Sequence, residues 1–335
     1  MSLKCPMPLV DEISHPQNAA PVARIAPSPT GFMHLGNART AMLAWLSARS
    51  GHGTVILRIE DIDTQRVVTG ATQALQEDLA LLGLDWDLGP GIDAAVGPFV
   101  QSQRTVLYDA ALDKLANDGL TFGCACSRAD LARLASAPHE GEEGPRYPGI
   151  CKGKAANIVA KEAARAGKLP AIRFRGSQQI HFVDGLMGAV TQTVDDFVLR
   201  RADGLHAYQL AVVVDDAAMG VTEVVRGDDL LSSTGRQIAL HQALGLQPPA
   251  FIHVPLVLSP TGERLAKRSR PETMREVLGR GVDVQALVGS LAASAGLCNP
   301  GQRMTARDLV AGFSWSKVTR SPVVIDPITL ESYSL

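Results

Sequence analysis

The sequence predicts an α/β fold in which a parallel sheet is covered by helices on both faces. Short apolar runs alternate with helical stretches over the first 120 residues, and the same alternation returns after residue 204. A stretch of different composition lies between them, which indicates an insertion. With 335 residues, 46% of them hydrophobic, the chain is long enough to bury a large core and to form two domains or one domain with a substantial insertion.

The first half of the predicted sheet follows a proline-containing lead-in over residues 1–20, which we expect to be flexible. The expected elements are strands at 22–26 and 54–59 and helices at 35–50, 71–82 and 103–118. The turn residues Pro27, Pro29 and Gly31 separate the first strand from the first helix. This order of strands and helices favours parallel pairing of the strands.

The second half of the sheet is expected after residue 204. Its expected elements are strands at 210–215, 221–225 and 251–258 and a helix at 230–245. Residues 21–120 and 205–270 therefore form one predicted domain that the insertion interrupts. The remaining residues, 271–335, are predicted to be a short, mostly helical region, because they are few for another independent domain.

The insertion covers residues 121–204 and is predicted to be an α+β domain. A stretch at 137–149 that is rich in glycine, proline and glutamate precedes a helix expected at 155–166. Alternating segments such as 171–175 follow, and their period of two is typical of strands.

Three of the five cysteines lie in this insertion: Cys124, Cys126 and Cys151. Five cysteines are too few for a disulfide-stabilised secreted scaffold, and thiolates clustered in this way are typical of a structural zinc site with four ligands. The residues alone leave the fourth ligand open. Tyr147 and His139 are the two alternatives, and tyrosine is an unusual zinc ligand.

The overall charge and hydropathy exclude some classes of protein. The formal net charge of −2 gives no global support for nucleic-acid binding, because proteins that grip phosphate backbones usually present a basic face. The sequence contains no run of about 18 apolar residues that could cross a membrane, and the N-terminus lacks the basic and apolar regions of a secretory signal. We therefore expect a cytoplasmic protein without a membrane partner.

The segment RIAPSPTGFMHLGNART, residues 24–40, combines a strand, a proline turn and a histidine at the start of a helix. This arrangement suits a nucleoside triphosphate. The amides at Leu35 and Gly36 would face the phosphates, and the imidazole of His34 would donate to a developing phosphate charge. The alternative is an ordinary strand, turn and helix with an incidental histidine.

Three later segments weigh against that alternative: TVILRIEDID at 54–63, LAVVVDDAAMGVTEVVRGDDLLSSTGRQ at 210–237 and TGERLAKRSR at 261–270. With them the chain resembles the glutamyl- and glutaminyl-tRNA synthetases over roughly residues 22–271. His34, Leu35, Gly36 and Asn37 resemble the HIGH signature of that family, and residues 264–268 resemble its KMSKS signature. The resemblance implies the Rossmann-like parallel sheet of class I aminoacyl-tRNA synthetases.

The resemblance also implies the ATP site. ATP, with Mg²⁺, would contact His34, Gly36, Asn37 and Lys267, and of these His34 and Lys267 would be the catalytic residues. Two features depart from the family pattern: Asn37 replaces a histidine, and Ala266 and Arg268 flank the lysine in place of serines. We interpret these changes as divergence without loss of activity, because the lysine is retained.

The amino-acid pocket that the resemblance implies comprises Arg24, Ala26, Ser28, Glu60, Tyr208 and Arg226. Two arginines against two carboxylates favour glutamate over glutamine, and Glu60 would receive the ammonium group of the substrate. A surface ion pair is the alternative for Glu60 and Arg226.

Further features resemble a shortened branch of this family, which activates glutamate without tRNA and attaches it to queuosine in the anticodon of tRNA(Asp). These features are a zinc site of the pattern Cys-x-Cys and Tyr-x₃-Cys, which favours Tyr147 as the fourth ligand, and the segment DLLSSTGRQ at 229–237. We expect no anticodon-binding domain in residues 271–335, and we expect a monomer. The alternatives are a truncated glutamyl-tRNA synthetase that charges tRNA(Glu) and a non-catalytic binding module.

Overall fold

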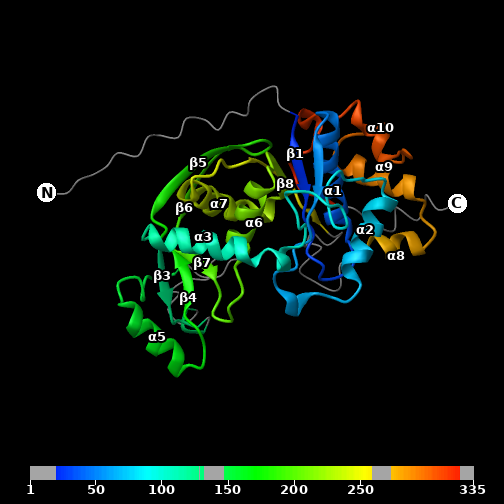
Figure 1. The fold of residues 1–335 in the computed structure, drawn as a ribbon. Helices are drawn as coiled ribbons and strands as arrows, with labels where there is room; N and C mark the ends of the chain where they lie inside the picture. Colours follow the sequence, from blue (N-terminus) through cyan, green and yellow to red (C-terminus); the bar gives the residue numbers. More distant parts are fainter. Residues whose placement is uncertain (1–19, 128, 132–146, 259–272, 325–335) are drawn as a thin grey trace.

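The computed structural model describes residues 20–127, 129–131, 147–258 and 273–324 (Figure 1). Its centre is a four-stranded sheet in the order β2-β1-β8-β9, and all neighbouring strands are parallel. The strands are β1 (Val22–Ile25), β2 (Thr54–Leu57), β8 (Glu223–Gly227) and β9 (Ala250–Val254). The parallel α/β sheet predicted from the sequence is confirmed.

The strand order creates a switch in direction between β1 and β8. After β1 the chain passes through α1 (Leu35–Ser50) to β2 on one side, whereas after β8 it passes through α7 (Leu231–Leu244) to β9 on the other. Ala23 of β1 pairs with Glu223 of β8, so strands 200 residues apart lie side by side. Ligands of open α/β sheets bind at the carboxyl ends of the strands at such a switch.

Helices cover both faces of the sheet, and side chains of β2 alternate between the two cores. Val55 and Leu57 pack with α1, whereas Ile56 packs in the opposite core, because successive side chains of a strand point to opposite faces. The helices of the first face are α1, α2 (Ala71–Leu81), α8 (Met274–Gly279), α9 (Val284–Ser294) and α10 (Ala306–Val310). Those of the second are α3 (Thr105–Asn117), α6 (Tyr208–Ala218) and α7.

The strand predicted at 210–215 is wrong, because these residues belong to α6. The run from Leu210 to Val213 is buried on every side, between α3, α7 and the sheet, so its apolar character does not reveal a period. The helical turn also places Asp215 and Asp216 together at its end, where both meet buried arginines.

The other predicted elements of this domain are present. The predicted helices at 35–50, 71–82, 103–118 and 230–245 are confirmed as α1, α2, α3 and α7, with ends that differ by a residue or two. The single strand predicted at 251–258 divides at Pro255 into β9 and β10 (Val257–Leu258). Strand β10 pairs in parallel with β11 (Val323–Val324), near the end of the described chain.

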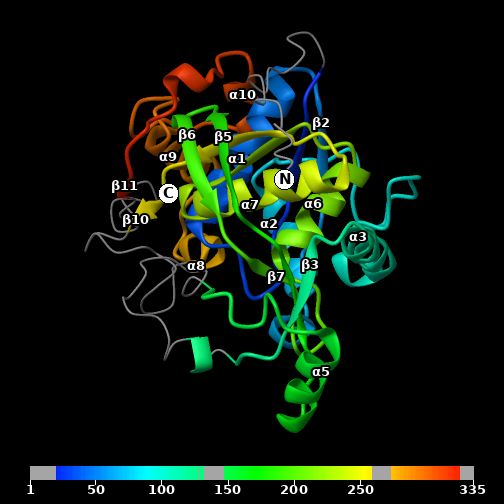
Figure 2. The same cartoon turned by 90° about the vertical axis from the view of Figure 1, so that its left-hand side faces the viewer.

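The inserted stretch forms two structures. One is the antiparallel sheet β3-β4-β7, formed by β3 (Thr121–Cys124), β4 (Ala171–Phe174) and β7 (Phe197–Arg200), beside α5 (Ala156–Arg165). The other is the hairpin of β5 (Gln178–Asp184) and β6 (Gly188–Val194), whose apolar side chains share a core with α6 and α7. Helix α5 lies at the opposite end of the molecule from α10 (Figure 2).

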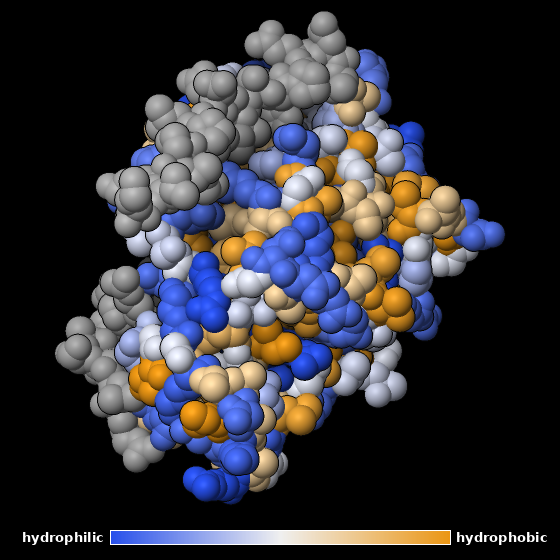
Figure 3. All heavy atoms as spheres, turned by 60° about the vertical axis from the view of Figure 1, so that its left-hand side comes forward, coloured by the Kyte–Doolittle hydropathy of each residue, from blue (hydrophilic) through white to orange (hydrophobic). Residues whose placement is uncertain are grey.

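In the described part of the C-terminal region, residues 273–324, the helices α8, α9 and α10 pack on α1 and α2, with turns and loops between them. Short 3₁₀ turns complete the elements at Thr64–Arg66, Gln101–Gln103, Asp228–Leu230 and Trp315–Lys317. None of the helices in the described ranges is long and apolar enough to span a bilayer. On the face drawn in Figure 3, hydrophilic and hydrophobic residues are interspersed.

Candidate active site and cysteine cluster

His34 caps the amino end of helix α1. Its Nδ1 accepts a hydrogen bond from the backbone amide of Asn37 at 3.4 Å, and burial lowers the pKa of the imidazole, against the opposing charge of Asp229. Gly36 lies beside the same Nδ1, and a Cβ atom at this position would be in van der Waals contact with it, at 3.4 Å. A neutral imidazole thus stands beside the positive end of a helix, an arrangement suited to binding phosphate.

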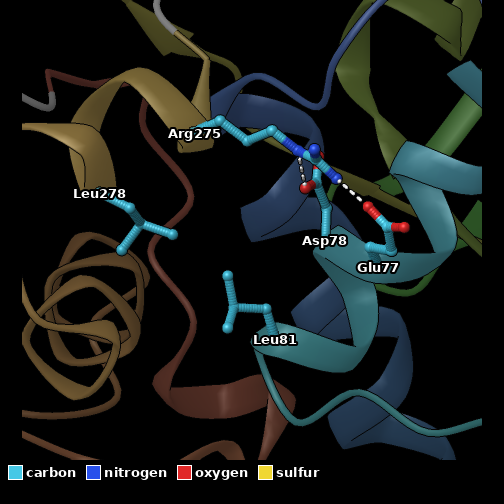
Figure 4. Close-up of a pocket in the computed structure, with 5 residues that line it drawn as sticks. All are labelled: Glu77, Asp78, Leu81, Arg275 and Leu278. Carbon is cyan, nitrogen blue, oxygen red and sulfur yellow. Dashed lines mark hydrogen bonds and ion pairs between the residues drawn. The ribbon is translucent and has the colours of Figure 1, made fainter.

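Helix α8 fixes the segment that carries His34. Thr273 forms a β-bridge with His34, and the buried carboxylate of Asp78 accepts from the Met33 amide at 3.4 Å and from Arg275 Nε at 2.6 Å. Figure 4 shows Arg275 reaching from α8 to Asp78 and Glu77 of α2. These residues border a hollow of about 360 Å³. The hollow is lined by Glu77, Asp78, Leu81, Arg275 and Leu278. Its walls serve to hold the loop before α1 and do not include the predicted substrate residues.

Arg24 lies on β1 at the switch between the two halves of the sheet and is buried. Its Nη1 donates to the backbone carbonyl of Val225 on β8 at 3.4 Å, and its Nε lies 3.6 Å from Asp216 Oδ1. Nε has no hydrogen-bond partner among the described residues. The guanidinium of Arg24 therefore has one buried donor, Nε, that no described residue satisfies with a hydrogen bond.

Arg226 lies on the neighbouring strand β8 and is 4% exposed. Its Nε donates to His253 Nε2 at 3.0 Å, Nη2 to Thr234 at 2.9 Å, and Nη1 to Gln237 at 2.7 Å and Tyr208 at 3.4 Å. All four partners are neutral groups, and no carboxylate of the described residues forms an ion pair with Arg226. Burial lowers its pKa for this reason. A buried cation of this kind is costly unless a ligand supplies the negative charge.

Glu60 follows β2, and the buried Arg58 connects it to the charged groups at the switch point. Arg58, which is completely buried, donates from Nη2 to Glu60 Oε1 at 3.0 Å and from Nη1 to Asp216 Oδ1 at 2.6 Å. Burial raises the pKa of Glu60, although the charges of Arg58 and Arg24 oppose the shift. The Arg58–Asp216 pair therefore contacts both predicted substrate residues: Arg58 binds Glu60, and Asp216 lies beside Arg24.

The remaining predicted residues differ in how closely they join this cluster. Ala26 and Ser28 follow directly after β1, where Ala26 is partly buried and Ser28 exposed. Asn37 is exposed in the first turn of α1. Lys267, with the whole segment 264–268, lies outside the described residues, and so does His139.

The three cysteines predicted to bind a metal come together at the end of β3. The Sγ atoms of Cys124, Cys126 and Cys151 lie within 4.8 Å of one another, and those of Cys126 and Cys151 are 3.7 Å apart. The hydroxyl of Tyr147 is 3.5 Å from the Cys124 sulfur. Tetrahedral zinc, with bonds of about 2.3 Å to sulfur and about 2.0 Å to oxygen, requires separations of about 3.8 Å between sulfurs and about 3.5 Å between sulfur and oxygen. The donor set fits this ion.

The surroundings of this cysteine cluster keep its donors in place. The Tyr147 hydroxyl accepts from the Cys151 amide at 2.8 Å, and the Arg173 guanidinium lies 4.0 Å from the Tyr147 ring centre. Burial, and after it the neighbouring sulfur of Cys124, raises the pKa of the Cys126 thiol to about 12. Four donors that touch mainly one another in a small core are therefore suited to a cation.

The sequence interpretation missed four residues that organise the site: Arg58, Asp184, Asp216 and His253. Arg58 carried a usable signal, since a charged residue stands in the middle of the apolar strand pattern before Glu60. Asp184 and His253 are 69 residues apart and meet only in the fold.

Comparison with known proteins places the chain in a family. Residues 22–321 match the family model of the catalytic domain of class I tRNA synthetases (E and Q). The chain is 47% identical over 309 residues to a glutamyl-Q tRNA(Asp) synthetase of Nitratidesulfovibrio vulgaris, covering 90% of this chain and 94% of that protein. It is 46% identical over 320 residues to the protein of the same name from Symbiobacterium thermophilum, covering 93% and 98%.

A solved structure agrees with these sequence relatives. The glutamate-tRNA synthetase of Elizabethkingia anophelis superposes with a TM-score of 0.80 at 25% identity, covering 94% of this chain and 70% of that one. The relatives of this chain are thus named as synthetases. The chain combines a parallel sheet with a histidine at the start of α1 and arginines at the switch point. The chain belongs to the class I tRNA synthetases of the glutamate and glutamine group, a family of ATP-dependent ligases.

Proposed function

We propose that this protein activates L-glutamate with ATP, without needing tRNA, and transfers the glutamate to queuosine in the anticodon of tRNA(Asp). The observation that carries the first step is the buried Arg226, which has no carboxylate partner among the described residues and lies on the strand next to Arg24 at the switch between β1 and β8. The identity of 46–47% to glutamyl-Q tRNA(Asp) synthetases supports the second step.

The pocket suits glutamate by its charges. The two carboxylates of glutamate would pair with the guanidinium groups of Arg24 and Arg226, and the Tyr208 hydroxyl lies beside Arg226. The ammonium group of glutamate would pair with Glu60. Ala26 and Ser28 line the turn between these groups. A glutamine side chain would leave the cation of Arg226 without its counter-charge, which favours glutamate.

Activation joins a carboxylate oxygen of glutamate to the α-phosphorus of ATP and breaks the bond between that phosphorus and the bridging oxygen of pyrophosphate. The reaction requires alignment of the carboxylate with the α-phosphate and stabilisation of the developing negative charge, but it requires no side-chain nucleophile. His34, Gly36 and Asn37 at the amino end of α1 would hold the triphosphate, which enters with Mg²⁺. Lys267 would stabilise the leaving pyrophosphate.

Transfer then joins a ring hydroxyl oxygen of queuosine to the activated carbonyl carbon and releases AMP. The hydroxyl proton leaves with this step, and an ester results. An anticodon loop presents unstacked bases, the usual target of specific RNA recognition. The rival acceptor is the 3′ end of tRNA(Glu), which the likeness to a glutamate-tRNA synthetase keeps open.

Zn²⁺ would be held by Cys124, Cys126, Tyr147 and Cys151 and would brace β3 against the turn at 147–151. Such a closed site with four protein ligands is structural. We propose further that the enzyme acts as a monomer in the cytoplasm.

The activation step is tested by glutamate-dependent exchange of pyrophosphate into ATP in the absence of RNA. We expect exchange with glutamate, far less with glutamine, and a loss of turnover in Lys267→Ala with little change in the KM for glutamate. Exchange that starts only when tRNA is added, or that glutamine supports equally, would contradict the proposal.

A further inference from the structure

A line of buried polar groups extends from Arg226 through His253 to Asp184. Asp184 at the end of β5, His253 on β9 and Arg226 on β8 follow one another at hydrogen-bond distances. Asp184 Oδ2 lies 2.6 Å from His253 Nδ1, and Arg226 Nε lies 3.0 Å from His253 Nε2. The side chains of Asp184 and His253 are fully buried.

The geometry determines where the proton of His253 resides. An arginine Nε always carries hydrogen and can only donate, so His253 Nε2 must be the acceptor. Thr234 supports this assignment, since its hydroxyl accepts from Arg226 Nη2 and lies 3.1 Å from the same Nε2, to which it can donate. The imidazole is therefore neutral with its hydrogen on Nδ1, where it donates to Asp184. Burial lowers the pKa of His253, which agrees with a neutral ring.

Asp184 is itself held in one orientation. Its Oδ1 accepts from the amides of Leu186 and Met187 at 3.0 and 2.9 Å, and the His253 amide lies 3.2 Å from Oδ2. Burial alone would raise the pKa of Asp184, but the hydrogen bonds from His253 and from these amides lower it. The carboxylate is thus ionised and can accept only.

We propose that Asp184 and His253 are positioning residues that orient Arg226, and that they thereby determine the affinity for glutamate and its discrimination from glutamine. The inference rests on the proposed glutamate activation. The dyad leaves the cation on Arg226, because a neutral histidine accepts from the guanidinium without cancelling its charge. A carboxylate in direct contact with Arg226 would instead neutralise it and compete with the substrate.

Asp184→Asn is the sharpest test, since it keeps the shape but adds a donor. With the carboxylate gone, the asparagine amide can donate to His253 Nδ1, which moves the ring hydrogen to Nε2. Two donors, Nε2 and Arg226 Nε, would then face each other, and Arg226 must turn away. We expect the KM for glutamate in RNA-independent exchange to rise by about ten- to hundredfold, with a smaller change in kcat, and the preference for glutamate over glutamine to fall.

A second pair of variants separates positioning from packing. His253→Gln retains an acceptor that reaches toward Arg226, whereas His253→Leu fills similar space without one. The proposal expects the KM for glutamate to increase in the order wild type, His253→Gln, His253→Leu, while the KM for ATP stays within about threefold. Asp109→Asn serves as the control, because Asp109 pairs with another buried histidine, His206, at 3.0 Å and does not reach the pocket.

The ring state of His253 is measured directly by ¹⁵N histidine spectra of the wild type and Asp184→Asn. Hydrogen on Nδ1 in the wild type and on Nε2 in the variant is expected. A wild-type ring with hydrogen on Nε2, or an Asp184→Asn enzyme with unchanged KM and specificity, overturns the inference while the proposed function stands. Wild-type enzyme without glutamate-dependent exchange refutes the proposed function, and the spectra then still report whether the dyad holds this tautomer. Equal KM values for His253→Gln and His253→Leu would also count against positioning.

Discussion

The proposed glutamate pocket, with its arginines at the switch point, and the cysteine cluster beyond β3 are both buried and polar, but they are stabilised differently. In the pocket the charged groups have neutral or opposite partners on other elements of the main domain, and the four groups that contact Arg226 lie on α6, α7 and β9. In the cluster the donors of Cys124, Cys126, Tyr147 and Cys151 contact mainly one another.

The difference indicates that the fold itself organises the pocket, whereas a bound metal ion would organise the cysteine cluster. The pocket is held by hydrogen bonds within a core of the main sheet, so removing one side chain should impair binding more than folding. The cluster lies in a small core of its own, with Phe122 and Val159, where a metal ion would provide most of the stabilisation. Loss of a ligand there should impair local folding more than glutamate activation.

The largest effect is expected for Arg226→Leu. Removing the guanidinium leaves the glutamate side chain without its counter-charge in a buried site, so kcat/KM for glutamate in pyrophosphate exchange should fall about a hundredfold or more. Arg49→Leu is the control, since Arg49 pairs with Asp85 and Asp87 at the surface. A loss of less than about threefold in Arg226→Leu would contradict the assignment of the pocket.

The next effect is expected for Cys126→Ser. We expect the purified wild type to contain one equivalent of zinc, and the variant to lose it and to unfold at a midpoint about 5 °C lower or more, because the thiols then lack a shared cation. Exchange activity should remain within a few-fold of the wild type. Cys298→Ser is the matched control, since its sulfur donates only to the Gly289 carbonyl. Wild-type protein without zinc would remove the proposed site.

A smaller effect is expected for Tyr147→Phe. The ring and its packing under Arg173 are retained, while the oxygen 3.5 Å from the Cys124 sulfur is lost. Zinc release to a chelator should become about tenfold faster with the midpoint of unfolding little changed. Release at the wild-type rate would assign the fourth position to water or to His139.

The smallest effect is expected from pH. Because burial raises the pKa of Glu60, this carboxylate takes up a proton at a higher pH than an ordinary glutamate as the pH falls. The protonated form cannot pair with the substrate ammonium, so the KM for glutamate should rise a few-fold toward acidic pH. The lowered pKa of His34 keeps that group neutral to a lower pH than an ordinary histidine. A KM that is as pH-dependent in Glu60→Gln as in the wild type would exclude this cause.

Local patterns in the sequence predict much of the molecule. The helix that begins at Leu35 is predicted by the turn before it, and the cysteine cluster by its spacing, and both are present. The strand expected at 210–215 failed because a short run that is buried on all sides has no readable period.

The support of the pocket could not be predicted in the same way. The contacts of Arg226 with His253 and of His253 with Asp184 join residues 27 and 69 positions apart, and only the pairing of β8 with β9 and the packing of the β5–β6 hairpin bring them together. Thr234 and Gln237 lie in the segment 229–237, and the resemblance of this segment to the shortened branch assigns no role to either residue. Sequence patterns indicate which groups meet the substrate, whereas the fold determines which groups hold them.

Acceptor specificity is the most direct test of the proposed function. Purified enzyme with labelled glutamate and ATP is offered tRNA(Asp) that contains queuosine, tRNA(Asp) that lacks it, and tRNA(Glu), and the glutamate bound to each RNA is counted. We predict that only the queuosine-containing tRNA(Asp) accepts glutamate. Efficient acceptance by tRNA(Glu), or equal acceptance by tRNA(Asp) with and without queuosine, would contradict the proposed function.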